Sequence, residues 1–358
     1  MTNEIRVPAQ MLEDFISEIF EAAGAGKDEA RAIGANLTMA SLTGHDSHGV
    51  VRTPRYLMNE RAGTMVFGQT VEAVIDRGAF ALLDGRFGFG QTVGHQATED
   101  GIVRARQHGV AVVALRNAGH LGRIGAWAEL AIEAGLVSIH FVNVANSMLV
   151  APFGGAERRF STAPVCVGIP NPGGDFLLDF ATSCAAEGKI LVAMKGGRPP
   201  PPGALIDGEG QPSADPEALY GPVAEGAVPD PRAGPGALTA MGDHKGSGLA
   251  FACELLAGAL TGSGTTSPGS RVHNGMLSIY ADPDRFDDGF GWGRAVADYV
   301  DFVRSARPAD PAHPVLAPGD AERIALGNRM ANGVPLSAEI WASLVAAGEG
   351  LGVKAPCV

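Results

Sequence analysis

The chain has 358 residues, of which 46% are hydrophobic and 18% charged, a balance typical of a globular protein with one large or two ordinary domains. The 39 Asp and Glu residues outnumber the 27 Lys and Arg residues, which gives a formal net charge of −12. This acidic balance argues against nucleic acid and against an anionic membrane surface as the main partner.

The first part of the chain predicts two helices between residues 8 and 42. Apolar residues recur at helical spacing after Pro8, and a second helix is expected over residues 27–42. A segment dense in polar groups, residues 44–55, follows, and we expect a loop that ends at the break before Pro54.

Strands and helices then alternate along the chain. Residues 71–83 predict two short strands, residues 91–107 and 124–134 predict helices, and residues 110–115 and 136–144 predict strands. This alternation predicts an α/β architecture, and the close sequence spacing of several strands favours a mixed sheet.

The composition changes sharply over residues 196–236, which hold ten of the 24 prolines. We interpret this Pro/Gly-rich segment as a long exposed loop with little regular structure. Beyond it the pattern predicts a helix over 248–260, a strand over 275–281, and helices over 294–303 and 337–347.

Helical ends around a strand-rich middle suggest two domains. The prediction is a mainly helical domain made of residues 1–70 with 287–358. Residues 71–286 would then form an α/β cofactor-binding domain that carries the loop 196–236.

The polar segment holds the densest group of reactive side chains, namely His45, Asp46, Ser47, His48 and Arg52. Histidine transfers protons near neutral pH, a neighbouring hydroxyl can orient it, and arginine offers a planar fork to a carboxylate. The pattern indicates a site for a carboxylic acid that carries a functional group at its α carbon. The alternative without function is a helix end with local hydrogen bonds.

Two other chemistries have weaker support in the same segment. His45 and His48 are three residues apart and could share a metal ion, but no acidic third ligand follows at a telling spacing. A Ser-His-Asp hydrolase is disfavoured because the adjacent Ser47 and His48 are expected to point apart. No GxSxG motif is present either.

Three further segments could contact a ligand. The glycine-rich turn 119–125 follows a predicted strand and opens a helix, so its backbone N–H groups could bind an anion, or it could be a simple tight turn. Asp179 could orient a ribose or an imidazole, or cap a helix that starts near Cys184. Lys245 at a predicted helix start suits a pyrophosphate, or is a solvated turn lysine. The GxGxxG spacing is missing, so a Rossmann site in its usual form is not predicted.

The cysteines and the N-terminal sequence predict a cytoplasmic protein. The first twenty residues are acidic and amphipathic, without the basic-then-apolar layout of a signal peptide, and the most apolar stretches carry polar residues that make a membrane span unconvincing. The chain has four cysteines, and their spacing does not match that of a metal site. We expect all four to be reduced thiols: Cys166, Cys184, Cys253 and Cys357.

Six motifs occur in this order: GHDSHGVVRTPRY, GHLGRIGAWAE, VAPFGG, LDFATS, GDHKGSGLAFACELLAGALTG and PGDAER. With them the chain resembles the type 2 malate/L-lactate dehydrogenase family over about residues 8–350. That family also contains L-sulfolactate and ureidoglycolate dehydrogenases, a diketogulonate reductase and reductases of cyclic imino acids. The resemblance implies a non-Rossmann L-sulfolactate dehydrogenase-like fold with NAD or NADP as cofactor. It also implies hydride transfer between a 2-hydroxy acid and a 2-oxo acid, and a homodimer with the active site near the subunit interface.

The resemblance also implies roles for matching residues. His48 would be the proton donor and acceptor at the substrate oxygen, assisted by Ser47, while Arg52 would bind the substrate carboxylate. Thr162 would lie on the substrate side, and His120 would line the cofactor with an alternative acid–base role. The other residues expected to line the cofactor are Leu121, Gly122, Arg123, Ile124, Ser147, Asp179, Phe180, Ala181, Lys245, Gly319 and Asp320.

The chain departs from the family pattern in three places. Ala163 stands where the family usually has Asn between Thr and Pro, which puts the local hydrogen bonding in doubt. Lys189 stands at the expected place of the acidic relay residue of cyclic-imine reductases, which argues against imine reduction. The stretch 222–236 is longer than usual, and we expect an idle surface insertion rather than a cover over the substrate pocket.

The expected function is that of a malate- or lactate-type dehydrogenase. The alternatives within the family are sulfolactate, ureidoglycolate, a keto-sugar acid or a cyclic imino acid as substrate. A catalytically inactive binding protein that kept the fold is a further alternative, although the complete set of Ser47, His48, Arg52 and Lys245 argues against it.

Overall fold

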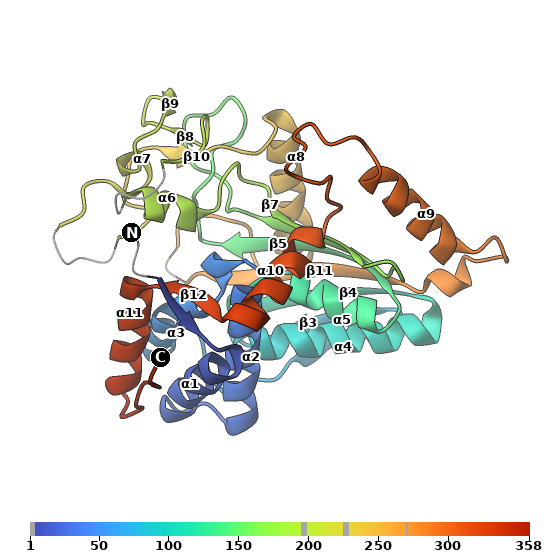
Figure 1. Ribbon diagram of the computed structural model, residues 1–358, viewed down its shortest axis with the longest axis horizontal. Coiled ribbons are helices and arrows are strands. Elements are labelled where there is room, and N and C mark those ends of the chain that lie inside the picture. The colour runs from blue at the N-terminus through green and yellow to red at the C-terminus, as the bar shows by residue number, and fades with distance from the viewer. Residues whose placement is uncertain (1–3, 195–198, 225–228, 270) are drawn as a thin grey trace.

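The computed structural model describes residues 4–194, 199–224, 229–269 and 271–358 (Figure 1). Its centre is a seven-stranded sheet in the order β2-β3-β4-β11-β5-β6-β7. β3 and β4 pair in parallel, and the other neighbours pair antiparallel. This confirms the predicted mixed sheet and excludes the parallel doubly wound sheet of a Rossmann domain. The strands are β2 (Glu72–Arg77), β3 (Phe80–Asp84), β4 (Val110–Ala118), β5 (Val137–Ala145), β6 (Pro164–Ile169), β7 (Phe176–Ala181) and β11 (His273–Ala281).

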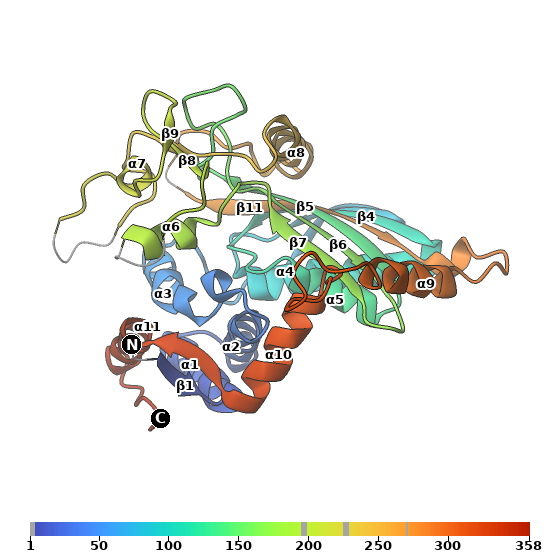
Figure 2. The ribbon, with the colours of Figure 1, turned by 45° about the horizontal axis from the view of Figure 1, so that its top comes forward.

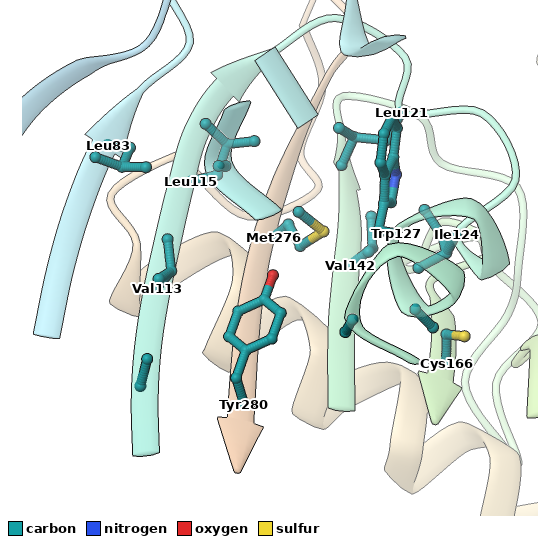
Figure 3. Packing of buried hydrophobic residues seen from close by; sticks show 14 of the residues in the cluster. Leu83, Val113, Leu115, Leu121, Ile124, Trp127, Val142, Cys166, Met276 and Tyr280 are labelled. Atoms are coloured by element: carbon teal, nitrogen blue, oxygen red, sulfur yellow. The ribbon is translucent and has the colours of Figure 1, made fainter. Parts of the chain in front are cut away.

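Helices cover both faces of this sheet (Figure 2). α4 (Gly90–His108) and α5 (Gly125–Glu133) pack on one face. α8 (His244–Cys253) and the π-helical η3 (Glu254–Leu260) pack on the other. Trp127 from α5 and Tyr280 from β11 are fully buried in the cluster that fills the first interface, as Figure 3 shows. The buried apolar side chains of the sheet therefore hold β4 and β7 in place. Residues predicted for the site lie at the ends of these two strands.

Both ends of the chain join a second hydrophobic cluster. β1 (Glu4–Val7) pairs antiparallel with β12 (Val334–Ser337), so the first and last strands lie side by side. The cluster combines residues from the N-terminal helices with Phe89, Val334, Leu336 and Leu344. Its helices are α1 (Ala9–Ala22), α2 (Lys27–Leu42), α3 (Thr53–Arg61) and α11 (Ala338–Glu349), with α10 (Asp320–Asn332) alongside α2.

The helix predicted over 294–303, assigned above to the helical domain, lies apart from this second cluster. α9 (Trp292–Arg304) contributes no residue to this second cluster, and it follows the short turn η4 (Pro283–Arg285). Figure 2 shows α9 beside the sheet rather than beside α1 and α2. The division into two domains with residues 287–358 in the helical one stays a prediction.

Thr53–Pro54 starts a helix, so the expectation of a break there was wrong. α3 begins at Thr53 with Pro54 in its first turn. Proline is tolerated at this position because the first N–H groups of a helix have no intrahelical acceptor. The consequence is that the polar segment is held between two helices, α2 and α3, instead of ending in an open loop.

The Pro/Gly-rich segment is also more ordered than expected. The described part of it forms a small sheet in the order β10-β8-β9, from β8 (Leu205–Ile206), β9 (Pro212–Ser213) and β10 (Ala237–Leu238), together with α7 (Glu217–Tyr220). Leu205, Leu219 and Tyr220 are buried in a third hydrophobic cluster. The prediction of an exposed loop was therefore wrong for this part, because enough apolar side chains interrupt the prolines to build a core. Residues 196–198 and 225–228 lie outside the described ranges.

Within the described ranges, no helix is both long and apolar enough to cross a membrane.

Candidate active site

The polar segment between α2 and α3 forms two tight turns, η1 (Asp46–His48) and η2 (Val50–Arg52). The backbone N–H of Val50 donates a hydrogen bond to Ser41 Oγ at 3.1 Å, which ties the second turn to α2. A Cβ atom at Gly49 would lie 2.1 Å from the same Oγ, so this close approach requires glycine. The reactive side chains therefore project from a backbone that is fixed on both sides.

Ser47 and His48 contact each other. Ser47 Oγ lies 3.1 Å from His48 Nδ1, so the expectation that the two side chains point apart was wrong in this tight turn. No carboxylate bonds to His48 in the described residues, and a Ser-His-Asp triad is not formed. Nor does any hydrogen bond there engage Nε2 of His48, which leaves this nitrogen available to a substrate.

His45 and His48 are not arranged to bind one metal ion together. His45 Nε2 lies 3.2 Å from Glu322 Oε1 on α10, and the neighbouring Asp46 pairs with Arg329 of the same helix. Among the residues that the structure describes, no three His, Cys, Asp or Glu side chains gather as a metal site would require. These two ion pairs instead attach the polar segment to α10.

His120 brings a second imidazole to the site from the turn after β4. The rings of His48 and His120 are stacked, with their centroids 5.6 Å apart and their planes 12° from parallel. His120 Nδ1 lies 2.7 Å from Tyr56 Oη, and Gln91 Nε2 donates to that phenol oxygen at 3.2 Å. Both histidines thus have one nitrogen engaged by the protein, and Nε2 of His120 also lacks a partner in the described part of the chain.

The surroundings keep both imidazoles neutral. Burial, followed by the positive charge of Arg52, lowers the pKa of His48 well below its ordinary value. The same two causes, with Arg55 in addition, lower the pKa of His120 to about 3. At neutral pH each ring is therefore a proton acceptor until a bound anion offsets the nearby arginine charge.

Arg52 lies between the turn that carries Ser47 and His48 and helix α6 (Glu187–Met194). Its Nε donates to the carbonyl of Ser47, and its Nη2 lies 3.9 Å from Glu187 Oε2. Tyr220 from α7 donates a hydrogen bond to Glu187 Oε1 at 2.6 Å. Tyr220, near the middle of the Pro/Gly-rich segment, therefore connects this segment to the site. The stretch 222–236 comes after Tyr220 in the chain.

Five of the twelve residues predicted to line the cofactor lie on or beside the edge strand β7. Gly319 and Asp320 lie near its start, where the N–H of Leu177 donates to Pro318 O at 3.2 Å. Asp179, Phe180 and Ala181, all partly exposed, occupy its second half. Beyond its end, the N–H of Thr182 donates to Thr162 O at 3.0 Å, and Ser183 bridges to Ala240, five residues before Lys245. Ser147 follows β5 and is partly exposed.

Several of these residues are already engaged by the protein. Leu121 and Ile124 are 1% and 2% exposed and pack in the sheet core, so only their backbone could meet a ligand. Arg123 is buried and pairs with Glu129, although its Nη1 has no hydrogen-bond partner among the described groups. Gly122 adopts a left-handed φ of 71° in the same turn. Asp320 accepts hydrogen bonds from Arg304 at 2.7 Å and Arg323 at 2.5 Å.

Asp179 caps a different helix from the one expected. Its Oδ2 accepts a hydrogen bond from the N–H of Gly125 at 2.7 Å, at the start of α5. The alternative in which it caps a helix near Cys184 is wrong, since α6 begins at Glu187. Burial raises the pKa of Asp179, and His45, the Gly125 N–H and Arg123 counteract part of this rise.

A cavity of about 300 Å³ opens beside the start of α8. Residues 151–156, which include all but the first residue of the VAPFGG motif, line it together with Glu209, Thr239, Ala240 and Asp243. Ser247 in the first turn of α8 accepts a hydrogen bond from the N–H of Phe153 at 2.9 Å, which joins the motif to this helix. Lys245 is exposed in the same turn.

Ala163 holds an unusual backbone conformation. Its φ is +33°, in the left-handed region that glycine and asparagine adopt more readily than alanine. Its N–H donates to Ser161 Oγ at 3.2 Å, and the residue is fully buried. Alanine in place of the family's usual asparagine at position 163 therefore affects the backbone strain beside Thr162 as well as the local hydrogen bonding.

Comparison with known proteins identifies the family. The family model for malate/L-lactate dehydrogenase matches residues 7–345. The chain belongs to this family. Hydroxycarboxylate dehydrogenase B of Escherichia coli (strain K12) is 39% identical, over 97% of this chain and 95% of that protein. The L-lactate dehydrogenase of Cupriavidus necator is 33% identical, over 95% and 96%. The sulfolactate dehydrogenase structure from Methanocaldococcus jannaschii superposes with a TM-score of 0.84 at 30% identity, covering 98% of each chain.

These comparisons confirm the fold and the enzyme class expected from the motifs. The chain is an oxidoreductase of the 2-hydroxy acid dehydrogenase class, and the family implies a nicotinamide cofactor in general. The predicted Ser47, His48, Arg52 and His120 lie together in this malate/L-lactate dehydrogenase family member.

Three residues of the site were not predicted. Tyr56 is the last residue of the first motif. It follows Arg52 by four residues, a spacing that places two side chains on the same face of a helix, so the sequence could have indicated that Tyr56 lies near the site. Glu187 and Tyr220 are 33 residues apart and had no sequence signal. Glu187 also weakens the argument against imine reduction, because an acidic side chain does lie at the site, two residues before Lys189.

Gly49→Ala tests whether close packing against Ser41 fixes the turn that carries Ser47 and His48. The new Cβ must displace either the Ser41 hydroxyl or the turn, so we expect the free energy of unfolding in urea to fall by about 1 to 3 kcal/mol. The double variant Ser41→Ala/Gly49→Ala should recover part of this loss, because the nearest clashing atom is gone. An unchanged free energy in Gly49→Ala would contradict the analysis.

Proposed function

We propose that the protein transfers a hydride between NAD(P) and a 2-oxo or 2-hydroxy acid, with His48 as the proton donor and acceptor. The observation that carries this proposal is the free Nε2 of His48 beside Arg52, with Nδ1 held by Ser47. A proton carrier next to a carboxylate-binding guanidinium suits a substrate whose reacting carbon is bonded to a carboxylate.

Arg52 positions the substrate and also controls the protonation of His48. When the substrate carboxylate binds to Arg52, it offsets the charge that lowers the pKa of His48, so the imidazole takes up a proton more readily. In reduction His48 gives this proton to the oxygen at C2, and in oxidation its neutral Nε2 accepts the proton of the hydroxyl. His120 stacks against His48 and restricts its ring orientation.

The row of residues along β7 and the cavity beside α8 fit a dinucleotide. β7 has six residues and a length of roughly 20 Å, which suits an extended ligand along a sheet edge. The exposed Lys245 in the first turn of α8 suits a phosphate, while Glu209 and Asp243 in the same cavity offer acceptors to hydroxyl groups. We propose that His120, Gly122, Ser147, Asp179 to Ala181, Lys245 and Gly319 hold the cofactor. When bound, the nicotinamide supplies or accepts the hydride.

A panel of 2-oxo acids tests the proposed reaction. NADH and NADPH should each be offered with pyruvate, oxaloacetate, a sulfonated 2-oxo acid, a keto-sugar acid and one cyclic imino acid. We expect loss of reduced-nicotinamide absorbance with at least one 2-oxo acid, which also decides between NAD and NADP. Absence of turnover across the panel in both directions, with cofactor binding measured separately, would contradict the proposal.

His48→Ala should remove the proton carrier without disturbing the cofactor row along β7. We expect kcat to fall by about a hundredfold or more, while the affinity for NADH, measured by fluorescence titration, stays within about twofold. His120→Ala is the matched comparison, because it also removes a stacked imidazole. A larger loss of kcat in His120→Ala than in His48→Ala would transfer the acid–base role to His120.

The direction of the pH dependence should differ between the two reactions. Because the pKa of His48 is lowered, its neutral form persists below pH 6.5, and oxidation should fall only under more acidic conditions. Reduction needs protonated His48, so kcat/KM for reduction should fall as pH rises. His48→Ala should lose both pH-dependent limbs, and profiles identical to the wild-type ones would contradict the role of His48.

We also propose a cytoplasmic homodimer. Aromatic residues on α9 and the preceding turn support it, since Phe286, Phe290, Tyr299 and Phe302 are 65% to 71% exposed. The four free cysteines support a reducing compartment. Light scattering should give twice the chain mass of 36.7 kDa, and Phe302→Glu should shift it toward one chain. Val103→Glu on exposed α4 surface is the control, and a wild-type protein of one-chain mass would contradict the dimer.

A further inference from the structure

The carboxylate of Glu187 is built into the substrate side of the site. A Cβ atom at Gly188 would lie 3.1 Å from Ser47 Cβ, so the start of α6 packs directly against the turn that carries Ser47 and His48. Glu187 Oε1 accepts the hydrogen bond from Tyr220, and Oε2 faces Nη2 of Arg52 at 3.9 Å. Both oxygens therefore have a defined place, and the side chain is 19% exposed.

The support behind Glu187 is rigid. Tyr220 is buried, and its helix α7 is fixed by Arg158, whose guanidinium donates to the carbonyls of Leu219, Gly234 and Pro231 at 3.0, 2.9 and 2.7 Å. The N–H of Gly234 returns a hydrogen bond to Leu219 O at 3.0 Å. The described part of the Pro/Gly-rich segment thus holds the Tyr220 phenol against Glu187.

Arg52 keeps hydrogen-bonding capacity despite this neighbour. A separation of 3.9 Å is an ion pair without a hydrogen bond, and only Nε of Arg52 donates within the described residues. The Nη groups can therefore receive one substrate carboxylate. A second substrate carboxylate nearby would meet the negative charge of Glu187.

The charge beside Arg52 favours a monoanion. Glu187 Oε2 lies 3.9 Å from Arg52 Nη2, so part of the positive charge of Arg52 is already offset before a substrate binds. One substrate carboxylate on the free Nη groups completes this balance, whereas a further anionic group near Glu187 would add repulsion. Lys189 is exposed and Asp46 pairs with Arg329, so neither side chain is paired with Arg52 in the described residues.

We propose that Glu187, held by Tyr220, is a specificity-determining residue that restricts the enzyme to 2-oxo and 2-hydroxy acids with one carboxylate and an uncharged side chain. This inference rests on the proposed function and names the substrate class of the same site. Dicarboxylic and sulfonated substrates are disfavoured because a second anionic group near Arg52 would be repelled by the Glu187 carboxylate.

Glu187→Gln tests the proposal, because the amide keeps the size and the hydrogen bond with Tyr220 but removes the charge. The measurement is the ratio of kcat/KM for pyruvate to that for oxaloacetate. We expect the wild type to favour pyruvate and the variant to shift the ratio toward oxaloacetate by about tenfold or more. Glu217→Gln is the matched control, since Glu217 is an exposed carboxylate on α7 with the same charge, and its ratio should equal that of the wild type.

Inhibitor binding to the wild-type enzyme gives a second measurement that needs no variant. The monoanion oxamate should inhibit about tenfold more tightly than the dianion tartronate. An equal inhibition by both, or an unchanged substrate ratio in Glu187→Gln, would overturn the role of Glu187. Absence of turnover across the whole panel of 2-oxo acids would instead count against the proposed function, while the oxamate and tartronate comparison still tests Glu187, so the two failures are distinguishable.

Discussion

The stacking of His48 on His120 is the contact on which the rest of the active site depends. His48 comes from the turn after α2, and His120 comes from the turn after β4, so the contact joins the N-terminal helices to the central sheet. Two protonated rings could not stack in this way without repulsion, and the lowered pKa of each ring keeps both neutral. Burial is the main cause of these lowered pKa values, and Arg52, the next cause, is also the residue that we propose for the substrate carboxylate. Under this proposal, the charge of Arg52 affects both the proton affinity of the rings and the binding of substrate.

Local periodicity and composition predicted much of the fold, and the reasons for the misses are physical. Helical spacing identified α1 and α2, and β-branched runs identified β4 and β5, because these elements bury one face along their whole length. β1 and β12 have four residues each and depend on pairing across the whole chain, which no local pattern records. The insertion of β11 between β4 and β5 is likewise a long-range pairing, and α10 has no buried residue to mark an apolar face.

The candidate site was predictable where its residues share one motif. Ser47, His48 and Arg52 fall within six residues, and the family resemblance supplied roles for them. Glu187 and Tyr220 could not be found in this way, because their place at the site results from the packing of α6 and α7. The prolines around Tyr220 led to the prediction of an exposed loop, whereas Arg158 donates hydrogen bonds to the carbonyls of Pro231 and Leu219 and so orders this part of the chain.

The pairing of β1 with β12 has a consequence for synthesis of the chain on the ribosome. The core shared by α1, α2 and α3 includes Val334, Leu336 and Leu344, so it stays incomplete until nearly the whole polypeptide has emerged. The sheet, whose strands end at Ala281, can assemble earlier. The turn that carries His48 gains its α10 contacts, Glu322 and Arg329, only in that last stage. A truncated nascent chain would therefore hold a formed sheet while the turn that carries His48 still lacked its contacts with α10.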